Sequence, residues 1–282
     1  MLQRGTSIDP FERIRLEGDP RDLSTRAWDL IAPIGRGQRC LVVSPPKAGK
    51  TTLLIEIAHA VERNHPEMAV HVLLVDERPE EVTHFRRGVR AKVHAASSDL
   101  SATEHVERTE EAMAEVLQKV LAGEDVLLLL DSITRVARAY NNVLSGTGRT
   151  LTGGLDASTM QAPRQIFGAA RKIEEGGSLT IVGTALVDTG SRMDEVIFQE
   201  FKGTGNTELV LSRDLFEKRI FPCIDIAKSG SRKEEKLVPP DLLPRLQMLR
   251  RVLAGKKPDE AMQGLLTLLQ KFPTNEALLK SF

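Results

Sequence analysis

Four short apolar runs recur along the chain, and more polar segments with helical periodicity separate them. The runs extend from Cys40 to Val43, Val70 to Val75, Val126 to Leu130 and Leu179 to Leu186. Continuous apolar runs of this length, without strict alternation, are typical of strands that are buried on both faces of a parallel sheet. The pattern therefore predicts a central sheet that is mostly parallel.

Helical patterns occupy the segments between these runs. Apolar residues fall on one helix face from Thr51 to Arg63, and Ser101 opens a capping-box sequence for a helix that ends before Gly123. A third helix is predicted from Ala157 to Glu174, with a kink or restart at Pro163. Alternation of strands and helices predicts an α/β fold with helices on both faces of the sheet.

The remaining segments carry weaker patterns. Glu208 to Leu211 and Ile220 to Ile226 are candidates for edge strands, and the tail reads as short helices interrupted by glycine and proline. The first residues are rich in proline and charge and lack core periodicity. We therefore expect a linker remnant over 1–22, a nucleotide-binding core over 23–240 and a helical C-terminal subdomain over 241–282.

The segment from Ser44 to Thr52, SPPKAGKTT, follows the first apolar run and reads as a strand, a phosphate-binding loop and a helix. Gly49 allows a tight turn that aims backbone N–H groups at phosphate oxygens. Lys50 adds a charge for the β- and γ-phosphates, and the Thr51 hydroxyl can ligate Mg²⁺. Ser44 replaces the first glycine of the usual motif, and two prolines stiffen the loop. The segment is either a chance match or a specialised phosphate loop.

Two further apolar runs end in carboxylates. Asp131 ends VLLLLD, where the carboxyl edge of an α/β sheet binds ligands, so it is a candidate Mg²⁺ residue; the alternative is a helix N-cap. The segment HVLLVDERPEEV places Asp76 and Glu77 at another strand end. We select Glu77 over Asp76 and Glu80 to polarise the water that attacks the γ-phosphate. An acidic helix start is the ordinary alternative.

Basic and aromatic residues gather late in the chain. The basic residues are Arg213, Lys218, Arg219, Arg232 and Lys233. An arginine on a loop can reach the γ-phosphate of a neighbouring subunit, although a solvated surface charge is the usual alternative for any one of them. Phe221 can stack on a base or fill the core, and the sequence slightly favours the core.

Two glycine-rich loops follow predicted elements, over Leu144–Asp156 and Asp188–Arg192, and each carries one arginine. Glycine, threonine and arginine suit backbone contacts to RNA phosphates and 2′-hydroxyls, whereas the alternative is an ordinary surface loop. A third segment, Gly35 to Arg39, precedes the first strand and is either a turn or part of a base pocket. A single G-x-G is weak support for the second interpretation.

Composition narrows the class of protein. Hydrophobic content of 41% and charged content of 28% are globular values, and the net charge of zero means that any nucleic-acid site is local. No apolar run approaches the roughly 20 residues that cross a bilayer, and the N-terminus lacks a signal-peptide core. Two cysteines without C-x-x-C spacing and six scattered histidines predict no zinc site. A cytoplasmic location is the expectation.

Together these segments closely resemble the ATPase domain of the bacterial transcription termination factor Rho family, from about Pro10 to the C-terminus. The matching segments are DLIAPIGRGQR (29–39), VSPPKAGKTTLL (43–54), VLLVDERPEEVT (72–83), LLLDSITRVARAYN (128–141), DTGSRMDEVI (188–197), EKRIFP (217–222) and SGSRKEE (229–235). The resemblance implies a RecA-like P-loop ATPase with a mostly parallel sheet, assembled as a homohexameric ring with ATP at its interfaces. It further implies ATP-driven 5′-to-3′ translocation on RNA, unwinding of RNA–DNA hybrids, and RNA polymerase and elongation factors as partners, with no membrane.

The resemblance also implies residue roles. Lys50 and Glu77 would be catalytic, with Arg232 as an arginine finger supplied to the neighbouring subunit and Arg219 as a second interface arginine. Thr51 and Asp131 would hold Mg²⁺. ATP contacts are implied for Gly35, Arg36, Gly37, Gln38, Arg39, Cys40, Lys47, Ala48, Gly49, Lys50, Thr51, Thr52, Arg78 and the adenine-stacking Phe221. RNA contacts in the central pore are implied for Gly148, Arg149, Thr150, Thr189, Gly190, Ser191 and Arg192.

The chain departs from the family pattern at several points. The residues before the core are too few for the OB-fold that captures RNA in relatives, so we expect either a fragment or a protein without primary RNA capture. Arg149 and Arg192 stand where many relatives have lysine, which keeps the charge but changes the donor geometry. Gln165 replaces a frequent basic residue, and Cys40 replaces a common glycine.

Two other functions remain open from the sequence. A rotary-type ATPase subunit shares the RecA-like core, but it would not need two Gly-Thr-Arg loops. A ring-assembly or regulatory module that binds ATP without translocation is the second, and the intact Lys50, Glu77, Asp131 and Arg232 argue against it.

Overall fold

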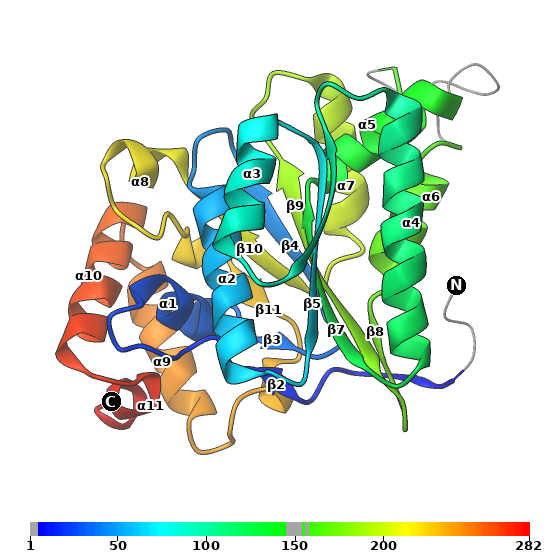
Figure 1. Cartoon of the computed structure of the whole chain (residues 1–282). Helices are drawn as coiled ribbons and strands as arrows, with labels where there is room; N and C mark the ends of the chain where they lie inside the picture. The colour runs from blue at the N-terminus through cyan, green and yellow to red at the C-terminus, as the bar shows by residue number, and fades with distance from the viewer. Residues whose placement is uncertain (1–4, 145–153, 156–157) are drawn as a thin grey trace.

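A twisted, mostly parallel sheet forms the centre of the molecule in this computed structural model, which describes residues 5–144, 154–155 and 158–282 (Figure 1). The strand order is β11-β10-β4-β9-β7-β5-β6. The four predicted runs are confirmed as strands. The parallel strands are β4 (Arg39–Ser44), β5 (Ala69–Glu77), β6 (Lys92–Ser97), β7 (Asp125–Asp131), β9 (Ser178–Leu186) and β10 (Thr207–Val210). Their carboxyl ends meet at one edge, which is the upper edge in Figure 1.

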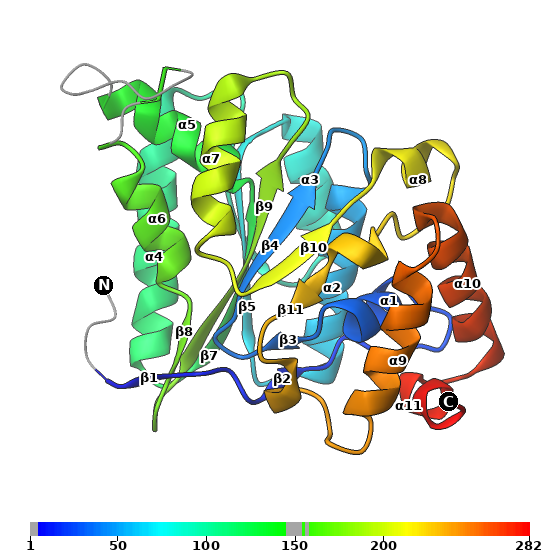
Figure 2. The same ribbon diagram turned by 180° about the vertical axis from the view of Figure 1, so that it is seen from behind.

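Helices cover both faces of this sheet, as predicted (Figures 1 and 2). One face carries α1 (Leu23–Ile31), α2 (Lys50–Asn64) and α3 (Pro79–Gly88). The other face carries α4 (Ala102–Leu121), α5 (Ile133–Leu144), α6 (Gln161–Gly168) and α7 (Arg192–Lys202). The sheet side chains divide between two apolar clusters: Val42 packs with the first group of helices, whereas Leu41 and Val43 pack with the second. Ser101 caps α4 with a complete capping box, as its sequence predicts.

Two sequence predictions in the second half of the chain are wrong. The helix predicted from Ala157 to Glu174 is limited to α6, and β8 (Arg171–Ile173) then pairs antiparallel with β9. Pro163 lies in the first turn of α6, where its missing N–H interrupts no helical hydrogen bond. The run from Ile220 to Ile226 forms no strand beyond an isolated bridge between Leu211 and Ile224.

The strand predicted over Glu208–Leu211 exists as β10, but it is not at the edge. The short strand β11 (Gly230–Ser231) pairs antiparallel with it and lies outside it. Two short helical segments, α8 (Arg213–Glu217) and η1 (Ile226–Lys228), lie between these two strands in the sequence, and a third, η2 (Glu234–Lys236), follows β11.

The segment before α1 packs on the core, although its sequence reads as a linker. Its β1 (Ser7–Ile8) pairs with β8, and its β2 (Arg13–Ile14) pairs with β3 (Ile34–Gly35). Ile14 and Leu16 are almost completely buried. The buried Asp29 carboxylate accepts hydrogen bonds from the N–H groups of Leu16 (2.9 Å) and Glu17 (2.8 Å). Two buried apolar side chains and the Asp29 carboxylate hold this segment against the core. They leave no helical periodicity in the sequence that would predict this packing.

The tail forms three helices, as predicted: α9 (Leu243–Ala254), α10 (Pro258–Lys271) and α11 (Asn275–Lys280). Their apolar residues belong to the same buried cluster as α1 and α2. The completely buried Arg26 of α1 donates hydrogen bonds to the carbonyls of Leu269 and Phe272, each at 2.8 Å. The segment over 241–282, predicted from the sequence as a C-terminal subdomain, therefore shares its apolar core with α1 and α2.

Among the described residues, no helix is both long enough and apolar enough to cross a membrane.

Candidate nucleotide-binding site

The loop between β4 and α2 has the backbone conformation of a phosphate cradle. Gly49 adopts φ = 80°, and a Cβ added there would meet no atom within 4 Å. Lys47 is also left-handed, at φ = 59°, and its side chain is exposed. The helix α2 begins directly after Gly49, so its N-terminal N–H groups and partial positive charge face the loop. Ser44 is buried, and its hydroxyl donates to the Pro45 carbonyl at 2.9 Å, which a glycine could not do.

Lys50 connects this loop to two acidic residues on neighbouring strands. Its Nζ lies 3.2 Å from Oε1 of Glu77 and also donates to Oδ1 of Asp131. Because β5 and β7 are adjacent and parallel, both carboxylates emerge at the same edge of the sheet. Burial lowers the pKa of Lys50, but the two carboxylates outweigh it and raise that pKa above its usual value. The three residues thus form one charged cluster at the carboxyl edge.

A β-bulge at the end of β5 decides which acidic residue enters the cluster. The register shifts between Val75 and Glu77, and Asp76 adopts φ = 55°. Glu77 is turned inward and is 3% exposed, whereas Asp76 is only half-buried. Burial and the nearby Asp131 raise the pKa of Glu77 to about 7, although Lys50 opposes the shift. A carboxylate with such a pKa is suited to orient and deprotonate a water molecule near neutral pH.

Asp131 has one carboxylate oxygen in use and one available. Its Oδ1 accepts hydrogen bonds from Lys50 and from the Thr184 hydroxyl at 2.7 Å. Its Oδ2 is buried and has no hydrogen-bond partner within the part of the chain that the structure describes. The Thr51 hydroxyl reaches only a long 3.5 Å contact with Glu81. Hydroxyl and carboxylate oxygens are the ligands that Mg²⁺ prefers, so these residues fit a Mg²⁺-bound nucleotide.

An apolar pocket of about 310 Å³ lies beside the phosphate loop. Its lining includes Ala48, Gly49, Thr52, Phe216, Phe221 and Cys223. The Phe221 ring is 47% exposed and meets the Phe216 ring edge-on, with centroids 5.6 Å apart. The slight preference of the sequence for a core role of Phe221 is therefore wrong, since a largely exposed aromatic side chain that lines a pocket has a free face for a base.

The structure separates Gly35–Cys40 from the phosphate loop. The segment precedes and begins β4, whereas the loop follows the other end of this six-residue strand, about 20 Å away. Cys40 is completely buried, and burial raises the pKa of its thiol. Arg36 forms ion pairs with Glu12, Glu67 and Asp125. Gly35, Arg36, Gly37, Gln38, Arg39 and Cys40 therefore lie apart from the phosphate loop of their own chain, and their contacts to ATP remain a prediction.

Arg232 also lies far from the phosphate loop of its own chain. It follows Ser231, which pairs with Thr207; Thr207 in turn pairs with Cys40, at the start of β4. Among the described residues, no hydrogen bond or ion pair involves the exposed Arg232 side chain, and only its backbone N–H is used, donating to the Asn206 carbonyl. Arg219 is exposed as well and lies 5.8 Å from the centre of the Phe216 ring. Arg78 is exposed beside Glu77, at the N-cap of α3.

One of the two candidate RNA loops falls within the described chain. Gly148, Arg149 and Thr150 lie outside it. The segment from Thr189 to Arg192 follows β9 at the carboxyl edge of the sheet and ends at the start of α7, with Arg192 exposed. The Thr189 hydroxyl donates to Asp194 at 2.6 Å, and Ser191 caps α7. These bonds anchor the loop and leave the Arg192 side chain directed to solvent.

Sequence reasoning missed two residues of the charged cluster. Arg135, in the first turn of α5, lies 3.4 Å from Glu77 and 2.9 Å from the Asp76 carboxylate. Thr184 in β9 donates to Asp131. Arg135 lies four residues after Asp131, at the start of the next helix, so the sequence could have placed it at the same edge of the sheet. Nothing in the sequence connects Thr184 to Asp131.

Comparisons with known proteins agree with this geometry. The family model for the ATP synthase alpha/beta family, nucleotide-binding domain, matches residues 24–231. Transcription termination factor Rho of Aquifex aeolicus is 54% identical over 99% of this chain and 65% of its own length. The Rho proteins of Chromobacterium violaceum (51% identical) and Buchnera aphidicola (52% identical) are matched over 68% and 67% of their lengths. The chain thus spans about two thirds of the length of these curated relatives.

Solved structures support the fold. An ATPase described as prototypical of the type III secretion system of pathogenic bacteria superposes with a TM-score of 0.79 at 25% identity, over 99% of this chain and 86% of that one. The assembled ATPase EscN from enteropathogenic E. coli superposes with a TM-score of 0.77 at 23% identity, over 98% of this chain and 71% of that one. The predicted RecA-like P-loop fold is confirmed.

Proposed function

The chain belongs to the transcription termination factor Rho family, and on this premise we propose that it is an RNA-dependent ATPase that moves 5′ to 3′ along RNA and unwinds RNA–DNA hybrids. The observation that carries the proposal is the meeting of Lys50, Glu77 and Asp131 beside a phosphate loop. RNA is the proposed substrate track, and RNA polymerase and elongation factors are the proposed partners in the cytoplasm.

Each residue of the charged cluster has a separate proposed role in ATP hydrolysis. Lys50 leaves its ion pairs to bind the β- and γ-phosphates. Thr51 and Asp131 would hold Mg²⁺, which would supply charge neutralisation at the phosphates. Glu77, released from Lys50, orients the attacking water and accepts its proton. Arg135 and Thr184 are positioning residues, because they hold Glu77 and Asp131. Lys47 in the phosphate loop and Arg78 at the start of α3, both exposed, are further proposed contacts to ATP.

A homohexameric ring is the proposed assembly, and the position of Arg232 supports it. Arg232 and Arg219 are exposed, and Arg232 lies at the far end of β4 from its own phosphate loop. An arginine that stabilises charge on a transferred phosphate must contact it directly. We therefore assign Arg232 to the nucleotide of a neighbouring subunit, and the family resemblance proposes Arg219 as a second interface arginine.

Replacement of Phe221 tests the adenine pocket. Stacking of a base on an aromatic ring contributes about 1–3 kcal/mol, so Phe221→Ala is expected to weaken ATP binding by roughly tenfold. Phe221→Trp keeps an aromatic face and is the matched control. Titration with a fluorescent ATP analogue measures both affinities. Equal affinities for Phe221→Ala and the unchanged chain would remove Phe221 from the site.

Replacement of Arg192 tests the RNA loop. Arg192→Ala removes the exposed cation and is expected to abolish stimulation of ATP hydrolysis by RNA, while ATP binding stays unchanged because the loop is anchored through Thr189 and Ser191. Arg192→Lys keeps the phosphate-binding charge and should retain stimulation. Hydrolysis rates measured with increasing single-stranded RNA distinguish the variants. Full stimulation of Arg192→Ala would contradict this role.

The two alternative functions differ from the proposed one in the RNA-stimulation assay: a rotary-type subunit would hydrolyse ATP without regard to RNA, and a regulatory module would not hydrolyse it. A rotary-type subunit is related through the ATP synthase alpha/beta domain, but 50–54% identity to Rho proteins favours an RNA-dependent enzyme. A regulatory module would bind ATP without turnover, and the converged Lys50, Glu77 and Asp131 favour an active site instead.

A further inference from the structure

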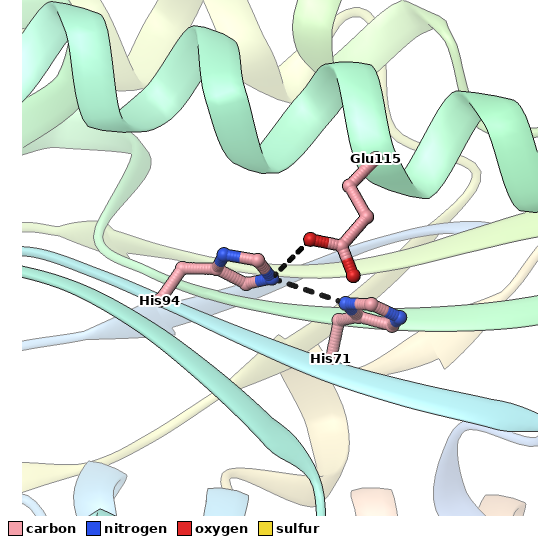
Figure 3. Close-up of side chains that lie close together, drawn as sticks. All are labelled: His71, His94 and Glu115. Atoms are coloured by element: carbon pink, nitrogen blue, oxygen red, sulfur yellow. Dashed lines mark hydrogen bonds and ion pairs between the residues drawn. The ribbon is translucent and has the colours of Figure 1, made fainter.

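Three potential metal ligands meet on the α4 side of the sheet, away from the phosphate loop. His71 lies in β5, His94 in β6 and Glu115 in α4. His94 pairs with Leu73, two positions after His71, so both imidazoles point to the same face of the sheet. Figure 3 shows Glu115 descending from α4 toward the two rings. Within the described chain, this is the one group of three histidine, cysteine or acidic residues close enough to share a metal ion.

The ligand atoms have the spacing of a zinc site. His71 Nδ1 and His94 Nε2 are 3.1 Å apart, and His94 Nε2 is 3.9 Å from a Glu115 oxygen. All three ligand atoms lie within 4.8 Å of one another. Tetrahedral zinc, bound at about 2.0–2.1 Å, keeps neighbouring ligand atoms about 3.3 Å apart. Small side-chain rotations therefore suffice to complete the site.

The imidazoles are in the protonation state that a metal needs. Burial, assisted by His94, lowers the pKa of His71 to about 4. Burial also lowers the pKa of His94, although Glu115 opposes the shift. These shifts favour the neutral rings at pH 7, and a neutral ring offers a lone pair to a metal once its single proton lies on the other ring nitrogen. A pair of neutral imidazoles pointing at each other satisfies only one hydrogen bond, whereas a metal uses both nitrogens.

The competing partner of Glu115 is easily displaced. Lys92 Nζ lies 2.6 and 2.7 Å from the two Glu115 oxygens, but the Lys92 side chain is 60% exposed. An exposed ion pair contributes little to stability, so Lys92 can turn into solvent. A pocket of about 330 Å³, lined in part by His94, Arg108, Glu111 and Glu115, adjoins the cluster and gives access to water.

We propose that His71, His94 and Glu115 bind one Zn²⁺ ion, through two imidazole nitrogens and a carboxylate, with water completing the coordination. Two imidazoles and one carboxylate form a ligand set that suits zinc rather than Mg²⁺. The ion fastens α4 to β5 and to the sheet-edge strand β6, so it stabilises the fold. Histidine spacing in the sequence could not indicate this site, because the three side chains come from elements distant in sequence.

Calorimetric titration of the chelator-stripped, nucleotide-free full chain with ZnCl₂ tests the proposal. We expect one ion per chain and a higher melting temperature with zinc, because a ligand that binds only the folded state stabilises it. Glu115→Gln and His94→Gln should each weaken binding by roughly tenfold or more, since losing outer-shell partners alone costs about 10–100-fold. Glu111→Gln, one turn earlier on α4 and lining the same pocket, is the matched control and should bind normally. MgCl₂ should not substitute.

Failure to bind zinc would overturn the proposal, as would unchanged affinity in Glu115→Gln, because the ion would then lie elsewhere. Circular dichroism establishes that each variant folds. If the more buried His94→Gln does not fold, Glu115→Gln decides alone, since the Glu115 side chain is 32% exposed and its replacement is compatible with folding.

Discussion

Glu77→Gln is expected to abolish ATP hydrolysis while leaving ATP binding close to that of the unchanged chain. The amide has nearly the shape of the carboxylate, but it cannot accept a proton from water. General-base catalysis contributes about 10²–10⁴-fold, so turnover should fall at least into that range. The proposed ATP contacts in the phosphate loop and the Phe221 pocket are not touched by the substitution, and Lys50 keeps its ion pair with Asp131. Single-turnover hydrolysis and nucleotide binding, measured on the same preparation, separate the two effects.

Glu80→Gln is the matched control for this experiment. Glu80 lies three residues further along, in the first turn of α3, and is exposed rather than buried. Its replacement should change turnover little, because a solvated carboxylate at a helix start complements the helix dipole only. Normal turnover in Glu77→Gln, or an equal loss in Glu80→Gln, would remove Glu77 from its proposed role.

Arg232→Ala is expected to inactivate mixed rings out of proportion to its content. An arginine finger contributes about 10³–10⁵-fold to phosphoryl transfer. Because Arg232 lies far from its own phosphate loop, it would supply this contribution to a neighbour in the proposed ring. A single substituted subunit then prevents hydrolysis at the neighbouring site. If the subunits hydrolyse ATP in sequence, hydrolysis in the whole ring ends there. Mixing the variant with unchanged chain at fixed total concentration, and measuring hydrolysis against the mixing ratio, should give a steep, concave decline.

Lys233→Ala provides the comparison. Lys233 is the adjacent exposed cation and is engaged with Asp9 at 2.8 Å. Rings that contain it should keep nearly full activity. A strictly linear decline for Arg232→Ala mixtures would indicate that Arg232 acts within its own subunit, and an unchanged rate would remove it from the site.

Local features of the site could be predicted from the sequence because their signals are contiguous. The strand, Gly49, Lys50 and the start of α2 fall within one short segment, and the family resemblance follows from several such segments. The placement of Glu77 and Asp131 at strand ends needed only the apolar runs that precede them, and ligands bind at the carboxyl edge of such a sheet. Family membership and the RecA-like fold are confirmed, and the individual residue roles remain predictions.

Features that depend on register or on distant packing could not be predicted. Gly35–Cys40 is near the phosphate loop in sequence, but the extended β4 places it at the opposite edge of the sheet. Phe221 is distant in sequence and reaches the pocket through a loop without regular structure. The strand β6 escaped detection because its segment, KVHAAS, mixes polar residues with small ones, and its His94 meets His71 only through strand pairing.

The rate of ATP hydrolysis with and without single-stranded RNA tests the central claim most directly. The full chain should be assayed with Mg²⁺, with Glu77→Gln as the inactive background and single-stranded DNA of the same sequence as the polymer control. We predict that RNA stimulates hydrolysis several-fold and that DNA does not, since the 2′-hydroxyl distinguishes the two polymers. A rate well above that of Glu77→Gln that RNA leaves unchanged would contradict the account and indicate an ATPase of another kind.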